Sequence, residues 1–117
     1  MYIHSVNREE SEALLKQSIL KHLGSLSGDA PVMLKLSIPA VENFYADLIA
    51  HPRVLRVVAL SGGYTRDEAD ELLAKNKGLI ASFSRALTQG LTAGQSDEEF
   101  NRELTVSIGK IYRASIA

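Results

Sequence analysis

Apolar residues recur along this chain at two different spacings, which predict helices that alternate with strands. Within residues 8–24 they recur every four positions, as on one face of a helix. We expect Asn7 to cap this helix, with Glu10 as its partner in a capping box. The apolar positions are Leu15, Ile19 and Leu23.

Three further helices are predicted from the same signals. The first covers residues 39–51 and has Pro39 in its first turn, where a missing N–H has no cost. The second covers residues 65–75, and the third begins at Ser96. Each of these two starts with a hydroxyl residue followed three positions later by glutamate, the pattern of a capping box.

Residues 32–38, 54–60 and 79–84 are predicted to be strands. The second is a nearly continuous run of β-branched and apolar residues, typical of a strand buried on both faces, as in parallel sheets. The strands start roughly 20 to 25 residues apart, the length of a compact βα unit. Alternating βα units with short loops predict a parallel α/β fold.

A sheet of three parallel strands is incomplete as a fold, because its edges are left unpaired. A closed βα barrel needs eight strands and roughly 250 residues, whereas this chain has 117. No linker or low-complexity stretch divides it. The sequence therefore predicts one segment of a larger structure, or a subunit that completes its sheet by association.

The composition of the chain argues against several classes of function. The 13 basic residues are interspersed with 14 acidic ones, for a net charge of -1, which argues against nucleic acid as a partner. No apolar run approaches the roughly 20 residues that a membrane span needs. Residues 1–8 lack the apolar core of a secretory signal, and there is no cysteine. We therefore expect a cytoplasmic protein without a membrane partner.

The predicted strand 32–38 carries one charged side chain. Because side chains alternate between the faces of a strand, Met33, Lys35 and Ser37 share a face opposite the apolar positions. An ammonium group is costly to bury, and desolvation favours the neutral amine that can attack a carbonyl. The alternative is a lysine near a strand end that extends into solvent.

Ser61, Gly62 and Gly63 separate the second predicted strand from the helix that opens at Thr65. Paired glycines allow the backbone to approach a ligand closely, and N–H groups at a helix start favour an anion. In βα barrels a phosphate commonly binds at the loops after the last two strands. The alternative is a plain strand-to-helix turn.

Ser82, Ser84 and Arg85 lie at the end of the third predicted strand. Arg85 could hold a phosphate through two parallel hydrogen bonds, and the two serines are candidate pocket-lining residues. The alternative is a surface arginine paired with an acidic neighbour. The lysine, the glycine pair and the arginine belong to three consecutive predicted strand ends on the same side of the sheet. This order along the chain is more informative than any one of the three signals.

Metal binding is not predicted. His4, His22 and His51 are far apart in the sequence, and no carboxylate stands beside them at a spacing typical of metal ligands. We expect surface or capping histidines. The acidic residues at 67–68 and 97–99 are first-turn charges that suit the helix dipole and are given no catalytic role.

Three segments carry a resemblance to a known family. Val-Met-Leu-Lys-Leu-Ser-Ile-Pro at 32–39 resembles the sixth barrel strand of class I fructose-bisphosphate aldolases, whose lysine forms the substrate imine. Leu-Ser-Gly-Gly at 60–63 resembles the end of strand seven, which binds the phosphate on carbon 1 of the sugar. Ser-Phe-Ser-Arg-Ala-Leu at 82–87 is similar to the strand-eight motif whose arginine contacts substrate phosphate.

The resemblance covers essentially the whole chain and is closest to the shorter bacterial form. It implies that residues 1–117 are a single C-terminal segment of a (β/α)8 TIM barrel, comprising about its last three βα units. The implied activity is that of a glycolytic and gluconeogenic lyase. Such an enzyme reversibly cleaves fructose 1,6-bisphosphate to dihydroxyacetone phosphate and glyceraldehyde 3-phosphate.

The resemblance also implies roles for individual residues. Lys35 would form the imine, whose positive charge is the electron sink, so that neither a metal nor another cofactor is implied. Ser61, Gly62, Gly63 and Arg85 would bind the phosphate of a phosphorylated sugar.

The chain departs from the family in what it lacks. The family's proton-transfer carboxylates and a second active-site lysine lie on earlier strands, and the predicted strands here contain no Asp or Glu. We expect the isolated chain to be inactive as an aldolase. The alternative is a non-catalytic phosphate-binding or assembly module, which self-associates or pairs with the missing half of a barrel.

Overall fold

The structure is a computed structural model that describes residues 6–117. No helix in that range has both the length and the apolar character of a membrane span. In chain order the elements are α1 (Arg8–Gly24), β1 (Val32–Ser37), α2 (Ala46–Ile49), β2 (Val54–Leu60), α3 (Arg66–Ala74), β3 (Ile80–Ala81), α4 (Arg85–Thr88) and α5 (Asp97–Ser115).

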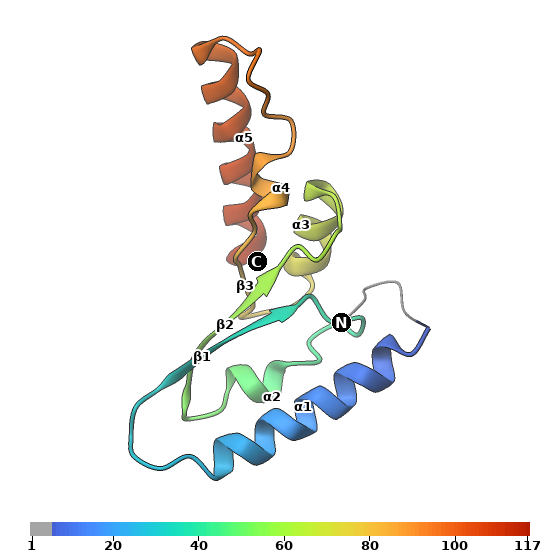
Figure 1. Ribbon diagram of the computed structural model, residues 1–117, viewed down its shortest axis with the longest axis vertical. Coiled ribbons are helices and arrows are strands. Elements are labelled where there is room, and N and C mark those ends of the chain that lie inside the picture. Colours follow the sequence, from blue (N-terminus) through green and yellow to red (C-terminus); the bar gives the residue numbers. More distant parts are fainter. Residues whose placement is uncertain (1–5) are drawn as a thin grey trace.

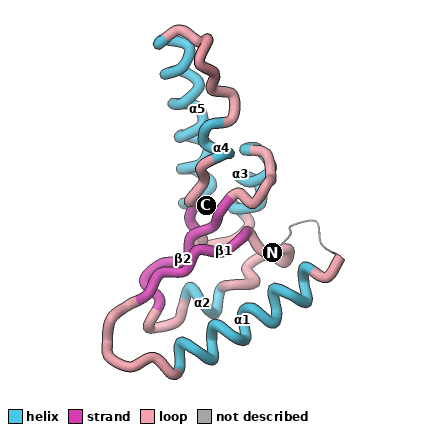
Figure 2. Tube along the Cα trace, viewed as in Figure 1, coloured by secondary structure: helices cyan, strands magenta, loops and turns pink. Residues whose placement is uncertain are grey.

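The three strands form one parallel sheet in the order β1-β2-β3, which confirms the predicted alternation of strands and helices. Lys35 of β1 pairs with Val58 of β2. A β-bulge between Val32 and Met33 shifts the register, so that Leu55 has no partner on β1. Figure 2 shows β1 and β2 running side by side.

The first two strands lie within one residue of their predicted bounds, but the third is much shorter than residues 79–84. Only Ile80 and Ala81 pair with β2. The Ser82 N–H still donates to the Ala59 carbonyl at 2.8 Å, after which the chain turns into α4, a helix that the sequence did not predict. The prediction was too long because the apolar run continues into this turn.

Within residues 6–117, helices cover only one face of the sheet. In Figure 1, α1 and α2 lie beside β1 and β2, whereas α3, α4 and α5 gather toward the end where β2 finishes. Val57 and Ala59 of β2 are fully buried in the core. On the opposite face Met33 is 58% exposed, and Lys35 and Arg56 are also exposed.

The expectation that β2 is buried on both faces is therefore wrong for this chain. Its Leu55 is 54% exposed, and its Arg56 is exposed as well. Among the described residues no second layer packs on the uncovered face of the sheet.

The predicted helix 39–51 shrinks to α2, which has four residues. Asn43 stands in the left-handed region with a φ of 57°, which interrupts a helix. Two reciprocal bonds hold it there: the Asn43 N–H donates to Asn76 Oδ1 at 2.9 Å, and the Lys77 N–H donates to Asn43 Oδ1 at 2.9 Å. A tertiary contact has overridden the local helical pattern.

The predicted capping boxes have different outcomes. At α3, the Thr65 hydroxyl accepts from the Glu68 N–H and the Glu68 side chain accepts from the Thr65 N–H, which confirms the box. At α5, Ser96 accepts from the Glu99 N–H as predicted. At α1 the box is wrong, because the Asn7 side chain makes no cap hydrogen bond.

Candidate functional site

Lys35 stands in the middle of β1, on the uncovered face of the sheet. Its side chain is exposed, as are those of Met33 and Arg56 on the same face. The apolar enclosure that the sequence argument required for a desolvated amine is not supplied by the described part of the chain. The amine is accessible to a ligand, but nothing here excludes water from it.

The turn after β2 depends on its glycines. The Tyr64 N–H donates to the carbonyl of Ser61 at 3.0 Å and closes the turn, while Gly62 and Gly63 adopt φ values of 64° and 98°. Two consecutive residues at positive φ are readily accommodated only by glycine. Ser61 is 5% exposed, so the turn is anchored at the end of the buried strand. The capped N-terminus of α3 follows directly at Thr65.

Arg85 lies across from this turn at the start of α4. Its side chain is exposed, and among residues 6–117 no carboxylate forms an ion pair with it. The alternative of a surface arginine paired with an acidic neighbour therefore does not describe this side chain. Its positive charge remains available to an anion.

The glycine turn and α4 form the two walls of one open pocket of about 320 Å³, which we call the anion pocket. It contains hydroxyl and amide groups and the Arg85 guanidinium, and no carboxylate lines it. A helix N-terminus, an unpaired arginine and the absence of lining acids all favour a bound anion. The lining residues are Ser61, Gly63, Tyr64, Thr65, Arg85, Ala86, Thr88 and Gln89.

The structure brings together some of the predicted site residues and separates others. Ser61, Gly63 and Arg85 share the anion pocket, with Gly62 in the same turn. Ser82 lines a different hollow, between the end of β3 and α5. Ser84 precedes α4, where its carbonyl accepts from the Thr88 N–H, and does not line the anion pocket. Lys35 does not line it either.

Sequence analysis missed several residues of the pocket, notably Tyr64 and Gln89. The Gln89 side-chain oxygen accepts from the Arg66 N–H at 2.8 Å, across a separation of 23 residues. No local pattern marks such a pair. Tyr64 follows the glycine turn directly, and its position there was a signal that could have identified it.

A buried ion pair joins α1 to the segments that follow β1 and β2. Arg8 and Glu12 are 8% and 1% exposed, and Arg8 Nε lies 2.7 Å from Glu12 Oε1. Arg8 also donates to the Tyr64 hydroxyl and to the carbonyl of Ile38, and the Ala40 N–H donates to Glu12 at 3.0 Å. Spacing of four residues on a helix was the sequence signal for this pair.

Burial, hydrogen bonds and nearby charges together set the pKa values of Arg8 and of its neighbour Tyr45. Burial by itself would lower the pKa of Arg8, but hydrogen bonds to Tyr64 and Glu12 offset that effect and raise it above its ordinary value. Burial raises the pKa of Tyr45 to about 12, and the negative charge of Glu12 adds to the shift. Arg8 is therefore charged and Tyr45 neutral at physiological pH.

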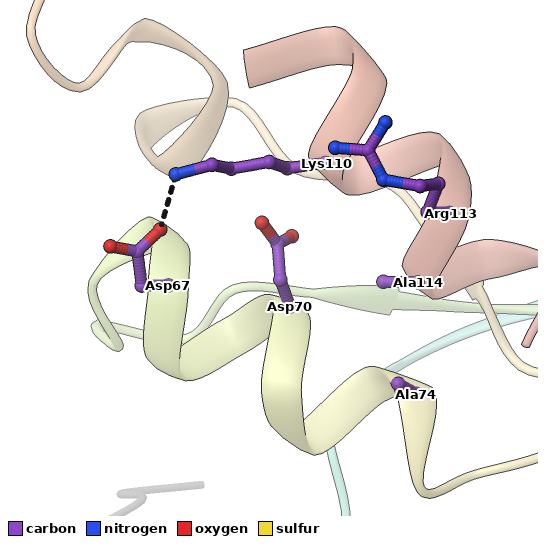
Figure 3. Close-up of a pocket in the computed structure, with 6 residues that line it drawn as sticks. All are labelled: Asp67, Asp70, Ala74, Lys110, Arg113 and Ala114. Carbon is purple, nitrogen blue, oxygen red and sulfur yellow. Dashed lines mark hydrogen bonds and ion pairs between the residues drawn. The ribbon is translucent and has the colours of Figure 1, made fainter. Parts of the chain in front are cut away.

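A second hollow lies between α3 and α5 (Figure 3). Two acidic and two basic side chains line it, and Lys110 Nζ lies 3.4 Å from Asp67 Oδ1. The Asp70 carboxylate points into the space between the two helices, and both of its oxygens are buried without a hydrogen-bond partner. Burial and then the nearby charge of Asp67 raise the pKa of Asp70. Because acidic and basic side chains balance in this lining, it does not favour a ligand of one charge, in contrast to the lining of the anion pocket.

No cluster of three or more potential metal ligands occurs in residues 6–117. His22 is exposed, and its Nδ1 lies 2.7 Å from the Ser18 carbonyl. His51 accepts from the Arg53 N–H at 3.1 Å in the turn that follows α2, whose C-cap is Ala50. His4 lies outside the described residues.

No family model matches the chain. Known proteins do: it is 58% identical over 114 residues to "Fructose-bisphosphate aldolase class 1" of Clostridium acetobutylicum. Proteins of the same name from Synechocystis sp. and Porphyromonas gingivalis are 59% and 53% identical over the same length. The chain is a relative of the class 1 fructose-bisphosphate aldolases.

The aldolase similarity covers 97% of this chain but only 38–39% of each relative. The chain thus spans less than half the length of the proteins that it matches, which is consistent with the C-terminal portion of an aldolase. The fold seen here, three parallel strands with flanking helices, is consistent with such a portion.

Proposed function

We propose that this chain is the phosphate-binding and imine-forming portion of a class I fructose-bisphosphate aldolase barrel. One observation carries the proposal: Ser61, Gly63 and Arg85 line a single pocket without a carboxylate, one βα unit beyond the strand that bears Lys35. The relatives' name supports an aldol reaction of a phosphorylated sugar as the chemistry of the complete barrel.

In the proposed reaction, the free amine of Lys35 attacks the C2 carbonyl of fructose 1,6-bisphosphate and water leaves to give an iminium. The C4 hydroxyl then loses its proton to a base that the rest of the barrel would supply, the C3–C4 bond breaks with its electrons flowing into the iminium to form an enamine, and glyceraldehyde 3-phosphate departs. Protonation and hydrolysis of the enamine release dihydroxyacetone phosphate and the free lysine. The anion pocket would hold a substrate phosphate and so position the carbonyl.

Proton transfer is the part that this chain does not supply. Its three strands carry no Asp or Glu, and Lys35 is exposed to solvent. Imine formation and hydrolysis both need a positioned acid and base. We therefore expect the isolated chain to bind phosphate without cleaving the sugar.

The proposal is tested by borohydride trapping with dihydroxyacetone phosphate, read by intact mass. Lys35→Ala is compared with Lys21→Ala, which removes an exposed lysine from α1. An adduct lost only in Lys35→Ala supports an imine site. An adduct that persists in Lys35→Ala would contradict the assignment of Lys35. Because the isolated chain lacks a positioned acid and base, we expect it to give little adduct by itself, and a folded wild type without any adduct would leave phosphate binding as the part of the proposal that this chain carries.

Pairing with another chain is a second proposal, and exposed apolar surface favours it. Met33 and Leu55 of the sheet are 58% and 54% exposed, and Ile108 and Tyr112 of α5 are 52% and 62% exposed. We propose that a second copy or the remainder of a barrel covers these side chains. Analytical ultracentrifugation should then show a dimer or larger species, and a monomer across the concentration range would contradict self-association.

A further inference from the structure

The two walls of the anion pocket come from segments that are separate in the sequence. One is the glycine turn with Thr65, and the other is α4 with the turn at Gln89. Because α4 has only four residues, it is not stable as an isolated helix. Contacts with longer elements must therefore hold Arg85 opposite the glycine turn.

Arg66, the first residue of α3, supplies contacts of this kind. Its backbone N–H donates to Gln89 Oε1 at 2.8 Å, and its Nη1 lies 3.4 Å from the Gln89 carbonyl oxygen. The same Nη1 donates to Glu103 at 2.9 Å and to Ser107 at 2.6 Å, both on α5. The Arg66 side chain is 11% exposed and Ser107 is fully buried.

The turn after α4 is shaped to receive the Glu103 carboxylate. Gly90 has a φ of 88°, and a Cβ on it would lie 2.8 Å from Glu103 Oε1. Gln95 donates to the Gly90 carbonyl at 2.9 Å and closes the turn from the other side. A side chain at position 90 would displace Glu103 and, with it, the acceptor of Arg66.

We propose that Arg66 and Glu103 are positioning residues of the anion pocket, which hold α4 and Arg85 against the glycine turn. Neither residue lines the pocket, so any effect on ligand affinity is transmitted through Gln89 and α4. The position of α5 is thereby coupled to phosphate affinity. This inference rests on the phosphate-binding role proposed above.

The test compares Glu103→Gln with Glu98→Gln in the full chain. Glu98 lies on the same helix and is 85% exposed, and its Oε1 lies 3.4 Å from Arg102 Nη2 in a surface ion pair. It is therefore a matched control. Inorganic phosphate is titrated while amide NMR follows Gly62 and Gly63. We expect Glu103→Gln to weaken phosphate binding about threefold to tenfold and Glu98→Gln to change it less than about twofold.

Hydrogen exchange of the Arg66 N–H, measured without phosphate, reports on the hydrogen bond from this N–H to Gln89. It should become at least about tenfold faster in Glu103→Gln than in Glu98→Gln if the contact to Gln89 loosens. In an Arg66→Met background, Glu103→Gln should have no further effect on phosphate affinity, because the two residues act through one contact. An added effect in that background would contradict transmission through Arg66.

The outcomes separate this inference from the proposed function. If the Arg66 N–H exchange rate or the phosphate affinity is the same in Glu103→Gln and Glu98→Gln, the positioning role is overturned. The phosphate site would remain in place. A folded wild type whose Gly62 and Gly63 signals do not respond to phosphate would overturn the phosphate site, and the positioning role with it.

Discussion

The anion pocket and the face that bears Lys35 belong to the same sheet but differ in how far the described chain completes them. The pocket has two walls, a capped helix start and a network from Arg66 to α5 that holds the walls together. The Lys35 face has only its strands, and Met33 on it is 58% exposed.

This difference follows from which elements each site needs. A pocket at the ends of two consecutive strands can be built from adjacent βα units, which this chain contains. A lysine whose amine must be desolvated needs a second layer over the sheet, and no described residue provides one. Under the proposed function, phosphate binding would therefore persist in this chain, whereas imine chemistry would depend on the rest of a barrel.

Glu12→Gln is expected to have the largest effect, because it perturbs both regions at once. Glu12 is 1% exposed and joins Arg8 to the backbone at Ala40, just beyond β1. Removing its charge leaves Arg8 buried with a weakened partner, and the free energy of unfolding should fall by about 3 kcal/mol. Urea unfolding of wild type and Glu12→Gln measures this difference in the free energy of unfolding. Glu9→Gln, on the exposed side of α1, should stay within about 0.5 kcal/mol of wild type.

Much of this architecture could be predicted from the sequence where local signals agree with the fold. β1 and β2 combine β-branched residues with clear boundaries, and Thr65 with Glu68 forms the box that their spacing indicates. The grouping of Ser61 with Arg85 followed from the parallel order of the strands, which places the loops after them at one edge.

Long-range side-chain contacts are what the sequence could not reveal. Asn43 breaks the predicted helix through Asn76, 33 residues away. Arg8 reaches the Tyr64 hydroxyl across 56 residues and so links the buried ion pair to a residue of the pocket wall. The exposure of Lys35 was also hidden, because a strand pattern shows which side chains share a face and not whether anything covers it.

Gly63→Ala should perturb the pocket and leave the Lys35 face unchanged. Gly63 has a φ of 98°, where an L side chain is strained, so we expect a loss of about 1 to 3 kcal/mol in the free energy of unfolding. Gly94→Ala is the matched control, because a Cβ there meets nothing within 4 Å. A Gly63→Ala variant as stable as Gly94→Ala would mean that the turn does not need glycine at this position.

Asp70→Asn should have the smallest effect, and it lies in neither region. Burial disfavours the charged carboxylate, whose oxygens have no hydrogen-bond partner, so the variant should be slightly more stable at neutral pH, by at most about 0.5 kcal/mol because solvent screens this partly exposed site. Because the folded-state pKa is raised, wild-type stability should fall as pH rises from about 4 through that pKa.

The pH series of thermal unfolding should therefore be flatter in Asp70→Asn than in wild type. Asp47→Asn serves as the control, since Asp47 is 70% exposed, pairs with Lys16 and is not among the charges that shift the pKa of Asp70. If Asp70→Asn follows the wild-type pH dependence, Asp70 is not the source of that dependence. Phosphate affinity should be unaffected in both variants.

The most direct test of the phosphate pocket is a titration of wild type and Arg85→Met with inorganic phosphate, followed at the amides of Gly62 and Gly63. The account predicts saturable shifts in wild type and binding at least about tenfold weaker in Arg85→Met, because a charge-assisted contact is lost. Arg102→Met, which removes an exposed arginine from α5, should bind as wild type does. Equal affinity in Arg85→Met and wild type, or no saturable shift in the folded wild type, would contradict the central claim.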